Sequence, residues 1–319
     1  MTTLVEALTE QVLAPSICLD MARYRFEFRT TAPILLPEYS GSTIRGAFGR
    51  SLRRIGCMTR QDDCKHCPLY RSCPYTAVFE TPPPQEHSLQ KFSQIPNAYV
   101  IEPPNWGRRV CSVGEPLIFD LVLFGKARHH LALIVFALQK AFSYEVGHGR
   151  AEFVRLSKVD AHEETVILEA GMERIIEHDI CTMVAVPNGG AVQVNILTPL
   201  RLQCNGVPLG PEKLTARSFL MAVARRVALI SEFQVGVRLP LDFHLLPEEA
   251  NGIHMHWSLG WKDWTRYSSR QKQKMSLGGV VGSLIFEELP LEFRLLLTAG
   301  TMTHVGKNAS FGLGGIRLG

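Results

Sequence analysis

The last sixteen residues of the chain, His304 to Gly319, combine five glycines with one histidine and two cations. Glycine lacks a Cβ and accepts positive φ angles, so a ligand can approach the backbone closely. Backbone N–H groups in such a loop can bind phosphate oxygens, and Lys307 adds a positive charge beside them. The segment therefore predicts a phosphate-binding loop, and the alternative is a glycine-rich turn without a ligand. We call residues 304–314 the Gly-rich loop.

Four cysteines lie within a short polar stretch, with the spacing Cys57-x6-Cys64-x2-Cys67-x5-Cys73. Soft thiolate ligands in this number suit a tetrahedral zinc ion, and a closed four-thiolate site has a structural role. The pattern predicts a structural Zn²⁺ site. Unmetallated or redox-active thiols and an iron–sulfur cluster remain as alternatives, because the same ligands serve those roles.

Two basic segments could contact a polyanion. A helix predicted over residues 42–54 carries Arg45, Arg50, Arg53 and Arg54 and no acid. A second segment, residues 261–274, interleaves two tryptophans and a tyrosine with five cations and one acid. Aromatic rings can stack on bases while cations contact phosphates. A solvated charged surface is the alternative for each segment.

Composition sets outer limits on the class of protein. The 319 residues are 46% hydrophobic with a net charge of +4, which indicates a globular protein and permits a polyanionic partner. No apolar run is long enough to cross a membrane, and the N-terminus lacks the basic region of a secretory signal. Four of the eight cysteines are clustered and the other four are scattered along the chain. This pattern fits a reducing compartment, so we expect a cytoplasmic protein.

Hydrophobic periodicity predicts the elements that position these residues. Alternating residues 22–30 predict a half-buried strand, and the residues up to 159 give the order strand, helix, strand, strand, helix, strand. This is the order of a ferredoxin-like unit. Residues 191–319 repeat it, and the unit closes with a helix, the Gly-rich loop and a final strand. The order excludes a dinucleotide fingerprint, which needs a strand before the glycines and a helix after them.

We therefore predict an α+β fold of two tandem ferredoxin-like domains with a Cys-rich zinc-binding insertion in the first. The predicted boundaries are residues 1–170 for the N-terminal domain, about 57–80 for its insertion, 171–190 for a linker and 191–319 for the C-terminal domain.

Together these features resemble the RAMP proteins of CRISPR systems, and most closely their CRISPR RNA-processing endoribonucleases. The resemblance covers nearly the whole chain from about residue 22 onward. It is carried by Ser40-Gly-Ser-Thr-Ile-Arg-Gly-Ala-Phe-Gly49, the cysteine cluster running into Cys73-Pro-Tyr, Thr198-Pro-Leu-Arg201, Arg266-Tyr-Ser-Ser-Arg-Gln271 and the Gly-rich loop. Each motif alone is common, whereas the combination is specific.

The resemblance implies a metal-independent ribonuclease that binds the repeat of precursor CRISPR RNA and cuts it once. In such enzymes the 2′-hydroxyl attacks the adjacent phosphate and leaves a 2′,3′-cyclic phosphate. It implies no cofactor for catalysis. The implied partners are the repeat RNA, as precursor and mature guide, and other Cas subunits of an interference complex.

This chemistry needs an acid, a base and cations, and histidine suits the proton steps at neutral pH. The family commonly has a histidine near the first helix, but no histidine lies between Met1 and Cys64 here. That stretch offers Tyr39 instead. By position His304, three residues from Lys307, is the best replacement. The predicted catalytic residues are therefore His304, Lys307 and Tyr39.

The predicted RNA contacts come from the basic helix, the aromatic basic segment and the Gly-rich loop. They are Arg45, Arg50, Arg53, Arg54, Lys262, Arg266, Tyr267, Arg270, Gln271, Gly306, Gly312 and Gly314. Two other functions remain open. One is a non-catalytic RAMP subunit that binds or caps guide RNA, which the missing N-terminal histidine favours. The other is a zinc-dependent structural adaptor that binds no RNA.

Overall fold

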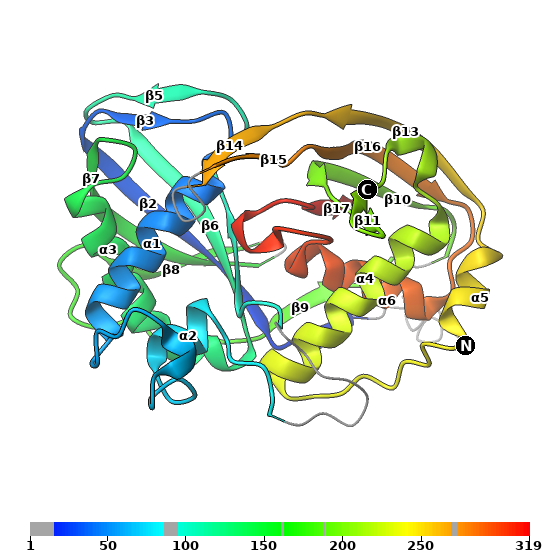
Figure 1. Cartoon of the computed structure of the whole chain (residues 1–319), viewed down its shortest axis with the longest axis horizontal. Helices are drawn as coiled ribbons and strands as arrows, with labels where there is room; N and C mark the ends of the chain where they lie inside the picture. Colours follow the sequence, from blue (N-terminus) through cyan, green and yellow to red (C-terminus); the bar gives the residue numbers. More distant parts are fainter. Residues whose placement is uncertain (1–15, 86–94, 161–162, 188, 269–272) are drawn as a thin grey trace, which may run out of the picture.

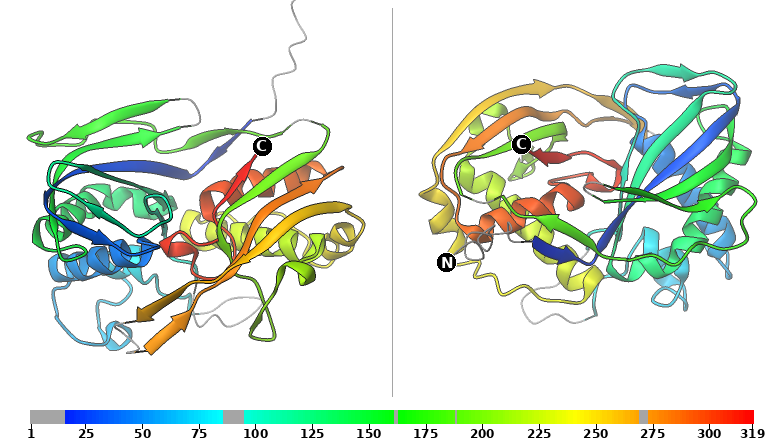
Figure 2. Two further views of the ribbon diagram at one scale, coloured as in Figure 1. Left: turned by 90° about the horizontal axis from the view of Figure 1, so that it is seen from above. Right: turned by 180° about the vertical axis from the view of Figure 1, so that it is seen from behind.

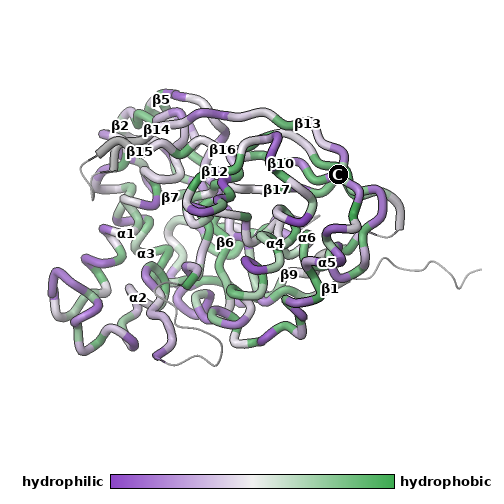
Figure 3. The backbone as a smooth tube through the Cα atoms, turned by 45° about the vertical axis from the view of Figure 1, so that its right-hand side comes forward, coloured by the Kyte–Doolittle hydropathy of each residue, from purple (hydrophilic) through white to green (hydrophobic). Residues whose placement is uncertain are grey.

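The computed structural model describes residues 16–85, 95–160, 163–187, 189–268 and 273–319. The chain is a mixed α/β protein built around two antiparallel sheets, each with helices on one face (Figure 1). Hydrophobic stretches concentrate in the interior and hydrophilic ones in the outer loops (Figure 3). No helix in the described ranges has the length and apolar character needed to cross a membrane.

The first sheet has five strands in the order β4-β6-β2-β7-β8. The side chains of β2 alternate, so Tyr24, Phe26 and Phe28 are fully buried against the helices while the charged residues between them, Arg25 and Glu27, face the other way. The elements are β2 (Met21–Ala32), α1 (Gly41–Gly56), β4 (Tyr99–Glu102), β6 (Pro116–Phe124), α3 (Leu131–Tyr144), β7 (Arg150–Val159) and β8 (Glu164–Glu169). The predicted half-buried strand is confirmed.

The second sheet has four strands in the order β13-β16-β10-β17, and its core forms against α4 and α6. A register shift between Ile196 and Leu200 of β10 coincides with Pro199, which lacks a backbone N–H. The elements are β10 (Val192–Leu200), α4 (Ala216–Ile230), a π-helical turn η5 (Ser231–Val235), α5 (Leu246–Asn251), β13 (Met255–Lys262), β16 (Gly279–Phe286), α6 (Leu291–Thr303) and β17 (Ile316–Leu318).

The two halves have the same connectivity. In the first half β2 lies between β6 and β7, and β4 lies beside β6. In the second half β10 lies between β16 and β17, and β13 lies beside β16. The predicted order of elements is thus present in both. The halves meet where Met302 of α6 packs against Val100, Val122 and Phe124, on the face of the first sheet opposite α1 and α3. Figures 1 and 2 show the red C-terminal segment at this junction.

Shorter elements connect these layers. They are β1 (Ser16–Leu19) with β9 (Thr182–Ala185), β3 (Ile34–Leu36) with β5 (Arg109–Cys111), β11 (Gln203–Cys204) with β12 (Val207–Pro208), β14 (Thr265–Ser268) with β15 (Gln273–Ser276), α2 (Pro74–Phe79), and the 3₁₀ turns η2 (Cys64–His66), η3 (Gly125–His130), η4 (Pro211–Lys213) and η6 (Ala309–Phe311). The β14–β15 hairpin extends the β13–β16 pair toward α1 (Figure 1).

Candidate functional site

The Gly-rich loop folds back onto the end of β10. The Val305 N–H donates to Gly314 O at 2.9 Å, which closes the loop on itself. Thr198 holds its far side, because its hydroxyl donates to Gly312 O at 2.7 Å and accepts from the Gly315 N–H at 2.8 Å. The loop is therefore a fixed structure between α6 and β17.

The glycines of this loop serve packing rather than an open cradle of amides. Gly312 and Gly314 are buried at φ +95° and +67°, a region that favours glycine. A Cβ at Gly312 would overlap the Tyr39 hydroxyl and Ile101 O, and one at Gly314 would overlap Val305 O. The predicted RNA contacts at these two glycines are therefore reassigned to close contacts within the protein.

The amides of the loop are also largely occupied. The N–H groups of Lys307, Phe311, Gly312, Gly314 and Gly315 all donate to protein oxygens. The prediction of a backbone phosphate cradle does not fit these five donors, because a donor already bonded within the protein is not free for a ligand. Gly306 is half-buried, and its neighbour Lys307 is exposed.

Two cationic residues are backbone neighbours where this loop meets the end of β10. The Lys307 N–H donates to Arg201 O at 3.0 Å, so the two residues are neighbours across the end of β10. The Arg201 guanidinium donates to Gly278 O at 3.1 Å and is half-buried. The Lys307 side chain is exposed, and a cation there is available to a phosphate.

His304 lies at the C-terminal end of α6, where the structure places it in the interior. It is 4% exposed, and both ring nitrogens have partners. Nε2 lies 3.0 Å from Glu102 Oε1, and Nδ1 lies 3.2 Å from Leu313 O. The predicted role of His304 as general acid or base meets a physical obstacle here, since no ring nitrogen faces the surface.

Glu102 connects His304 to the first sheet. Arg23 donates to both of its carboxylate oxygens, at 2.7 and 2.9 Å, and also to Thr301 O at 3.3 Å. Burial alone would raise the pKa of Glu102, but the opposing effects of Arg23 and His304 are greater together and lower it to about 2. Glu102 is therefore ionised across the physiological pH range.

Tyr39 lies in an aromatic cluster that joins three segments. Its ring centroid is 4.7 Å from that of Trp106 and 5.1 Å from that of Trp264, and Phe311 of the Gly-rich loop completes the cluster. The Tyr39 hydroxyl is buried without a hydrogen-bond partner among the described residues. Burial, and secondly the charge of Glu102, raise the pKa of Tyr39, so the phenol stays protonated. Lys262 lies 4.0 Å above the Trp106 ring.

The four arginines of α1 divide into two pairs. Arg45 donates to the Tyr99 hydroxyl at 3.0 Å and lies over the Phe79 ring, and Arg53 donates to Gln61 O and Asp62 O. These two bind the protein itself. Arg50 and Arg54 are exposed and line a groove of about 830 Å³ with Phe136, Lys140 and Tyr144.

The aromatic basic segment is described in part. Arg266 and Tyr267 lie on β14, whereas Arg270 and Gln271 lie outside the described residues. At the base of this hairpin Trp264 is buried, and Leu277 N–H donates to Trp264 O at 2.7 Å. The structure thus brings Tyr39, Lys262 and the Gly-rich loop together at the hairpin base, with the hairpin extending beyond them.

The four clustered cysteines are free thiols that line one small cavity between α1 and α2. The Arg60 N–H donates to Cys57 Sγ at 3.2 Å, and the Thr59 hydroxyl lies 3.3 Å from Cys67 Sγ. In the described ranges no three His, Cys, Asp or Glu side chains are already arranged as a metal-binding group. The zinc prediction therefore stays a prediction.

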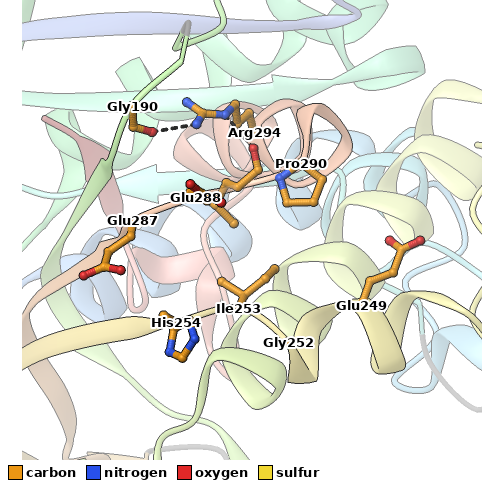
Figure 4. A pocket seen from close by; sticks show the side chains of 10 residues that line it. Gly190, Glu249, Gly252, Ile253, His254, Glu287, Glu288, Pro290 and Arg294 are labelled. Carbon is orange, nitrogen blue, oxygen red and sulfur yellow. Dashed lines mark hydrogen bonds between the residues drawn. The ribbon is translucent and has the colours of Figure 1, made fainter.

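A second pocket, of about 700 Å³, lies at the opposite end of α6 (Figure 4). Glu249, Glu287 and Glu288 line it together with His254. Its one arginine, Arg294, is buried and donates to the carbonyls of Leu289, Pro187, Gly189 and Gly190. The acidic lining is unfavourable for a phosphate backbone.

The residues that hold the loop in place give little signal in the sequence. No local pattern singles out Arg23 or Glu102, and Thr198 and Arg201 stand out only as part of the motif Thr198-Pro-Leu-Arg201. Pro199, which interrupts an otherwise regular strand, is the one local signal that β10 changes register beside the loop.

Comparisons with known proteins add an independent line of evidence. The AF_1859_N family model, described as an N-terminal domain, matches residues 19–180, about half of the chain. The model described as CRISPR-associated endoribonuclease Cas6 matches residues 194–316. No curated protein sequence matches the chain.

Several solved structures are similar to this chain in fold. A Cas6 product complex is 12% identical with a TM-score of 0.54, over 93% of this chain and 98% of that chain. A partial Cas6-RT-Cas1–Cas2 complex is 12% identical with a TM-score of 0.56, over 96% of this chain and 47% of that chain. A Cas6-RT-Cas1–Cas2 complex is also similar, and the match covers 29% of its chain. The protein therefore spans less than half the length of the matched chains in these two complexes.

The chain therefore has a mixed α/β fold that is similar to the fold of these solved structures. The match over residues 19–180, about half of the chain, places the chain in the AF_1859_N family, and residues 194–316 are similar to the Cas6 family model.

Proposed function

We propose that the protein is a repeat-processing endoribonuclease that binds the repeat of precursor CRISPR RNA and cuts it. The observation that carries this proposal is the exposed Lys307 next to Arg201, on a loop fixed between the two sheets and beside an aromatic cluster. Cations contact the RNA backbone, and the exposed Trp261 ring beside the hairpin offers a stacking surface. The match of residues 194–316 to the family model described as CRISPR-associated endoribonuclease Cas6 supports the same reaction class.

In the proposed reaction the RNA 2′-hydroxyl attacks the adjacent phosphate without a metal ion. The products carry a 2′,3′-cyclic phosphate and a 5′-hydroxyl. Lys307 stabilises the charge that develops on the phosphate, and Arg201 adds to the local positive potential. Tyr39, protonated and without a partner, is the proposed hydrogen-bond donor to the reacting group. It is 2% exposed, so the aromatic cluster has to open for this contact.

We further propose that the two halves are tandem ferredoxin-like units. The support is that both sheets place the first strand between the third and fourth, with the helices on one face. The cleavage product, in this proposal, is the guide RNA in the cytoplasm. Known Cas6-RT-Cas1–Cas2 complexes support the proposal that other Cas subunits are partners.

A second candidate is a non-catalytic RAMP subunit that only binds guide RNA. The occupied nitrogens of His304 favour it, because the described residues of the loop then offer no histidine for proton transfer.

One experiment separates the two candidates. Wild-type protein is incubated in EDTA with radiolabelled cognate repeat RNA and with the same RNA carrying 2′-deoxyribose before the scissile phosphate. The proposal expects cleavage of the first RNA to a cyclic phosphate, and binding without cleavage of the second. Binding of both RNAs without any product would support the non-catalytic subunit. Cleavage of the 2′-deoxy RNA would refute the proposed mechanism.

We also propose that Cys57, Cys64, Cys67 and Cys73 bind a structural zinc ion. The cavity they line has a volume of about 10 Å³, about that of one water-sized sphere. Four thiolates supply a complete tetrahedral ligand set, and Arg53 already fixes the intervening segment to α1. A modest inward movement of the four side chains would complete the site.

Elemental analysis of the purified protein tests this second proposal. We expect one zinc per chain in the wild type and in Cys204→Ser, which changes an exposed cysteine outside the cluster, and loss of zinc in Cys64→Ser. Wild-type protein free of zinc after expression in zinc-supplemented medium would contradict it. Iron in place of zinc would support the iron–sulfur alternative instead.

A further inference from the structure

Two cysteines outside the four-cysteine cluster lie side by side where the chain enters and leaves the first half. Cys18 lies on β1 and is exposed, and Cys181 directly precedes β9 and is half-buried. Both are free thiols. We propose that Cys18 and Cys181 form a reversible oxidation site, at which a peroxide joins them in a disulfide bond. This inference is independent of the proposed function.

The pairing of β1 with β9 brings the two thiols to one face. The antiparallel register sets Cys18 opposite Met183 and Leu19 opposite Thr182. Residues two apart along an extended chain point to the same side, so Cys181 lies diagonally across from Cys18. The two side chains already touch, because the Cys18 thiol is hydrogen-bonded to that of Cys181. This hydrogen bond is the main reason that the pKa of Cys18 is raised.

One buried arginine holds the backbone beside both cysteines. Arg128 of η3 is 8% exposed, pairs with the carboxylate of Asp20 and donates a hydrogen bond to Ile180 O. Asp20 lies two residues after Cys18. Ile180 directly precedes Cys181. A single guanidinium therefore fixes both segments, which lowers the entropy cost of bringing the two sulfur atoms together.

Two further contacts hold the Cys181 side. Lys158 of β7 donates to Cys181 O at 3.2 Å, and the Thr182 hydroxyl donates to Met21 O at 2.8 Å. These contacts tie the segment to β7 and β2 of the first sheet. A disulfide bond requires the two sulfur atoms to lie about 2.05 Å apart. The remaining step is a short approach of two side chains that are already in contact.

A peroxide supplies the oxidising equivalent for this bond. The sulfur of Cys18, the exposed partner, attacks one oxygen of hydrogen peroxide, and the O–O bond breaks to give a sulfenic acid and one water. The Cys181 sulfur then attacks the Cys18 sulfur, so the S–S bond forms and the S–O bond breaks, which releases the second water. Two thiols and one peroxide thus give one disulfide and two waters. Excess thiol in a reducing compartment reverses the bond by exchange.

The bond would join the two ends of the first half. Residues 18–181 contain every strand of the first sheet together with α1 and α3. Nearly the same stretch, residues 19–180, matches the AF_1859_N family model. A cross-link between the ends of this unit restricts its unfolded states more than its folded state. The oxidised protein should therefore unfold at a higher temperature than the reduced protein.

Peptide mapping of the full-length protein tests the bond itself. The protein is reduced, freed of reductant, treated with hydrogen peroxide, alkylated and digested with trypsin without reductant. Cys18 and Cys181 are the only cysteines in the tryptic peptides 1–23 and 175–201, so a species that links these peptides identifies the bond.

We expect the linked species in the wild type and in Cys204→Ser, which changes an exposed cysteine elsewhere, and its separation by dithiothreitol. Peroxide-treated wild-type protein that lacks this species, while Cys18 is over-oxidised or linked to another cysteine, would overturn the proposal.

Thermal unfolding tests the consequence. The oxidised wild type should have a Tm about 5 °C or more above that of oxidised Cys18→Ser, whereas the reduced forms of the two proteins should have similar Tm values. Both proteins keep the four clustered cysteines, so oxidation of the cluster affects them equally. Cys204→Ser should behave as the wild type. Equal Tm values for the oxidised wild type and oxidised Cys18→Ser would refute the stabilising role of the bond.

Discussion

The two ends of α6 differ sharply in their electrostatic surroundings. At its start, the pocket of Figure 4 is lined by three glutamates, and the buried Arg294 is fully engaged with backbone carbonyls. At its end, the Gly-rich loop presents Lys307 at the surface beside Arg201. Acids near a helix N-terminus and cations near its C-terminus both suit the helix dipole. Only the C-terminal end offers exposed positive charge to a phosphate backbone.

The number of cations near a site is therefore a poor guide to what the site binds. Arg294 is a cation within the acidic pocket, but its hydrogen bonds are all made inside the protein. Lys307 is a single cation with an exposed side chain. A cation that is hydrogen-bonded within the protein, such as Arg294, has a structural role, whereas an exposed cation such as Lys307 is available to a ligand.

The largest effect is expected at Lys307. Lys307→Ala should lower the single-turnover cleavage rate of repeat RNA by about 10²–10³-fold, because removing one group that stabilises transition-state charge has effects of this size. Lys213→Ala, at an exposed position on η4, is the control and should change the rate less than twofold. Equal rates for the two variants would remove Lys307 from the mechanism.

The next effect concerns the glycine that contacts Tyr39. Gly312→Ala combines a strained φ of +95° with steric overlap, so we expect a loss of about 3 kcal/mol in the free energy of unfolding. Gly206→Ala keeps a positive φ of +81° but meets open space, and should cost about 1 kcal/mol. Chemical denaturation measures both variants. Equal losses would mean that the contact with Tyr39 adds nothing.

A third effect concerns the ionised Glu102 in the interface between the halves. Its pKa is lowered from 4.5 to about 2, so its stabilising contribution is present above pH 4.5 and is lost as the pH falls toward 2. That contribution is up to about 3 kcal/mol. Glu102→Gln should flatten the acid limb of the stability curve, whereas Glu152→Gln on the exposed side of β7 should leave it unchanged.

The smallest effect is expected in the acidic pocket. Glu249→Gln and Glu287→Gln should leave repeat-RNA affinity and cleavage within twofold of the wild type, because both residues line the pocket at the start of α6, at the other end of the helix from Lys307. A large gain in affinity would show that RNA also approaches this end. Fluorescence anisotropy at two salt concentrations distinguishes a local contact from general repulsion.

Much of the fold could be predicted from the sequence. The alternation in β2, the continuous apolar run of β6 and the helical spacing of α1 each reflect one buried face, and they appear where expected. The short β1–β9 pair and α2 were not predicted, since a few residues carry no clear period.

The site was harder to predict because its contacts are distant in the sequence. Glu102 lies 202 residues before His304, and no local pattern indicates that the two side chains meet. A glycine permits a close approach of RNA as well as a close approach of another side chain such as Tyr39. The sequence alone does not distinguish these two roles. The loop was therefore located correctly, while the partners of Gly312 and His304 could only come from the structure.

Photo-crosslinking of cognate repeat RNA to the wild-type protein, followed by mass spectrometry of the cross-linked peptides, tests the central claim most directly. The account predicts cross-links within residues 262–268 and within the Gly-rich loop around Lys307, and none in the pocket residues Glu249, His254 and Glu287. Cross-links confined to that acidic pocket, with none in the Gly-rich loop, would contradict it.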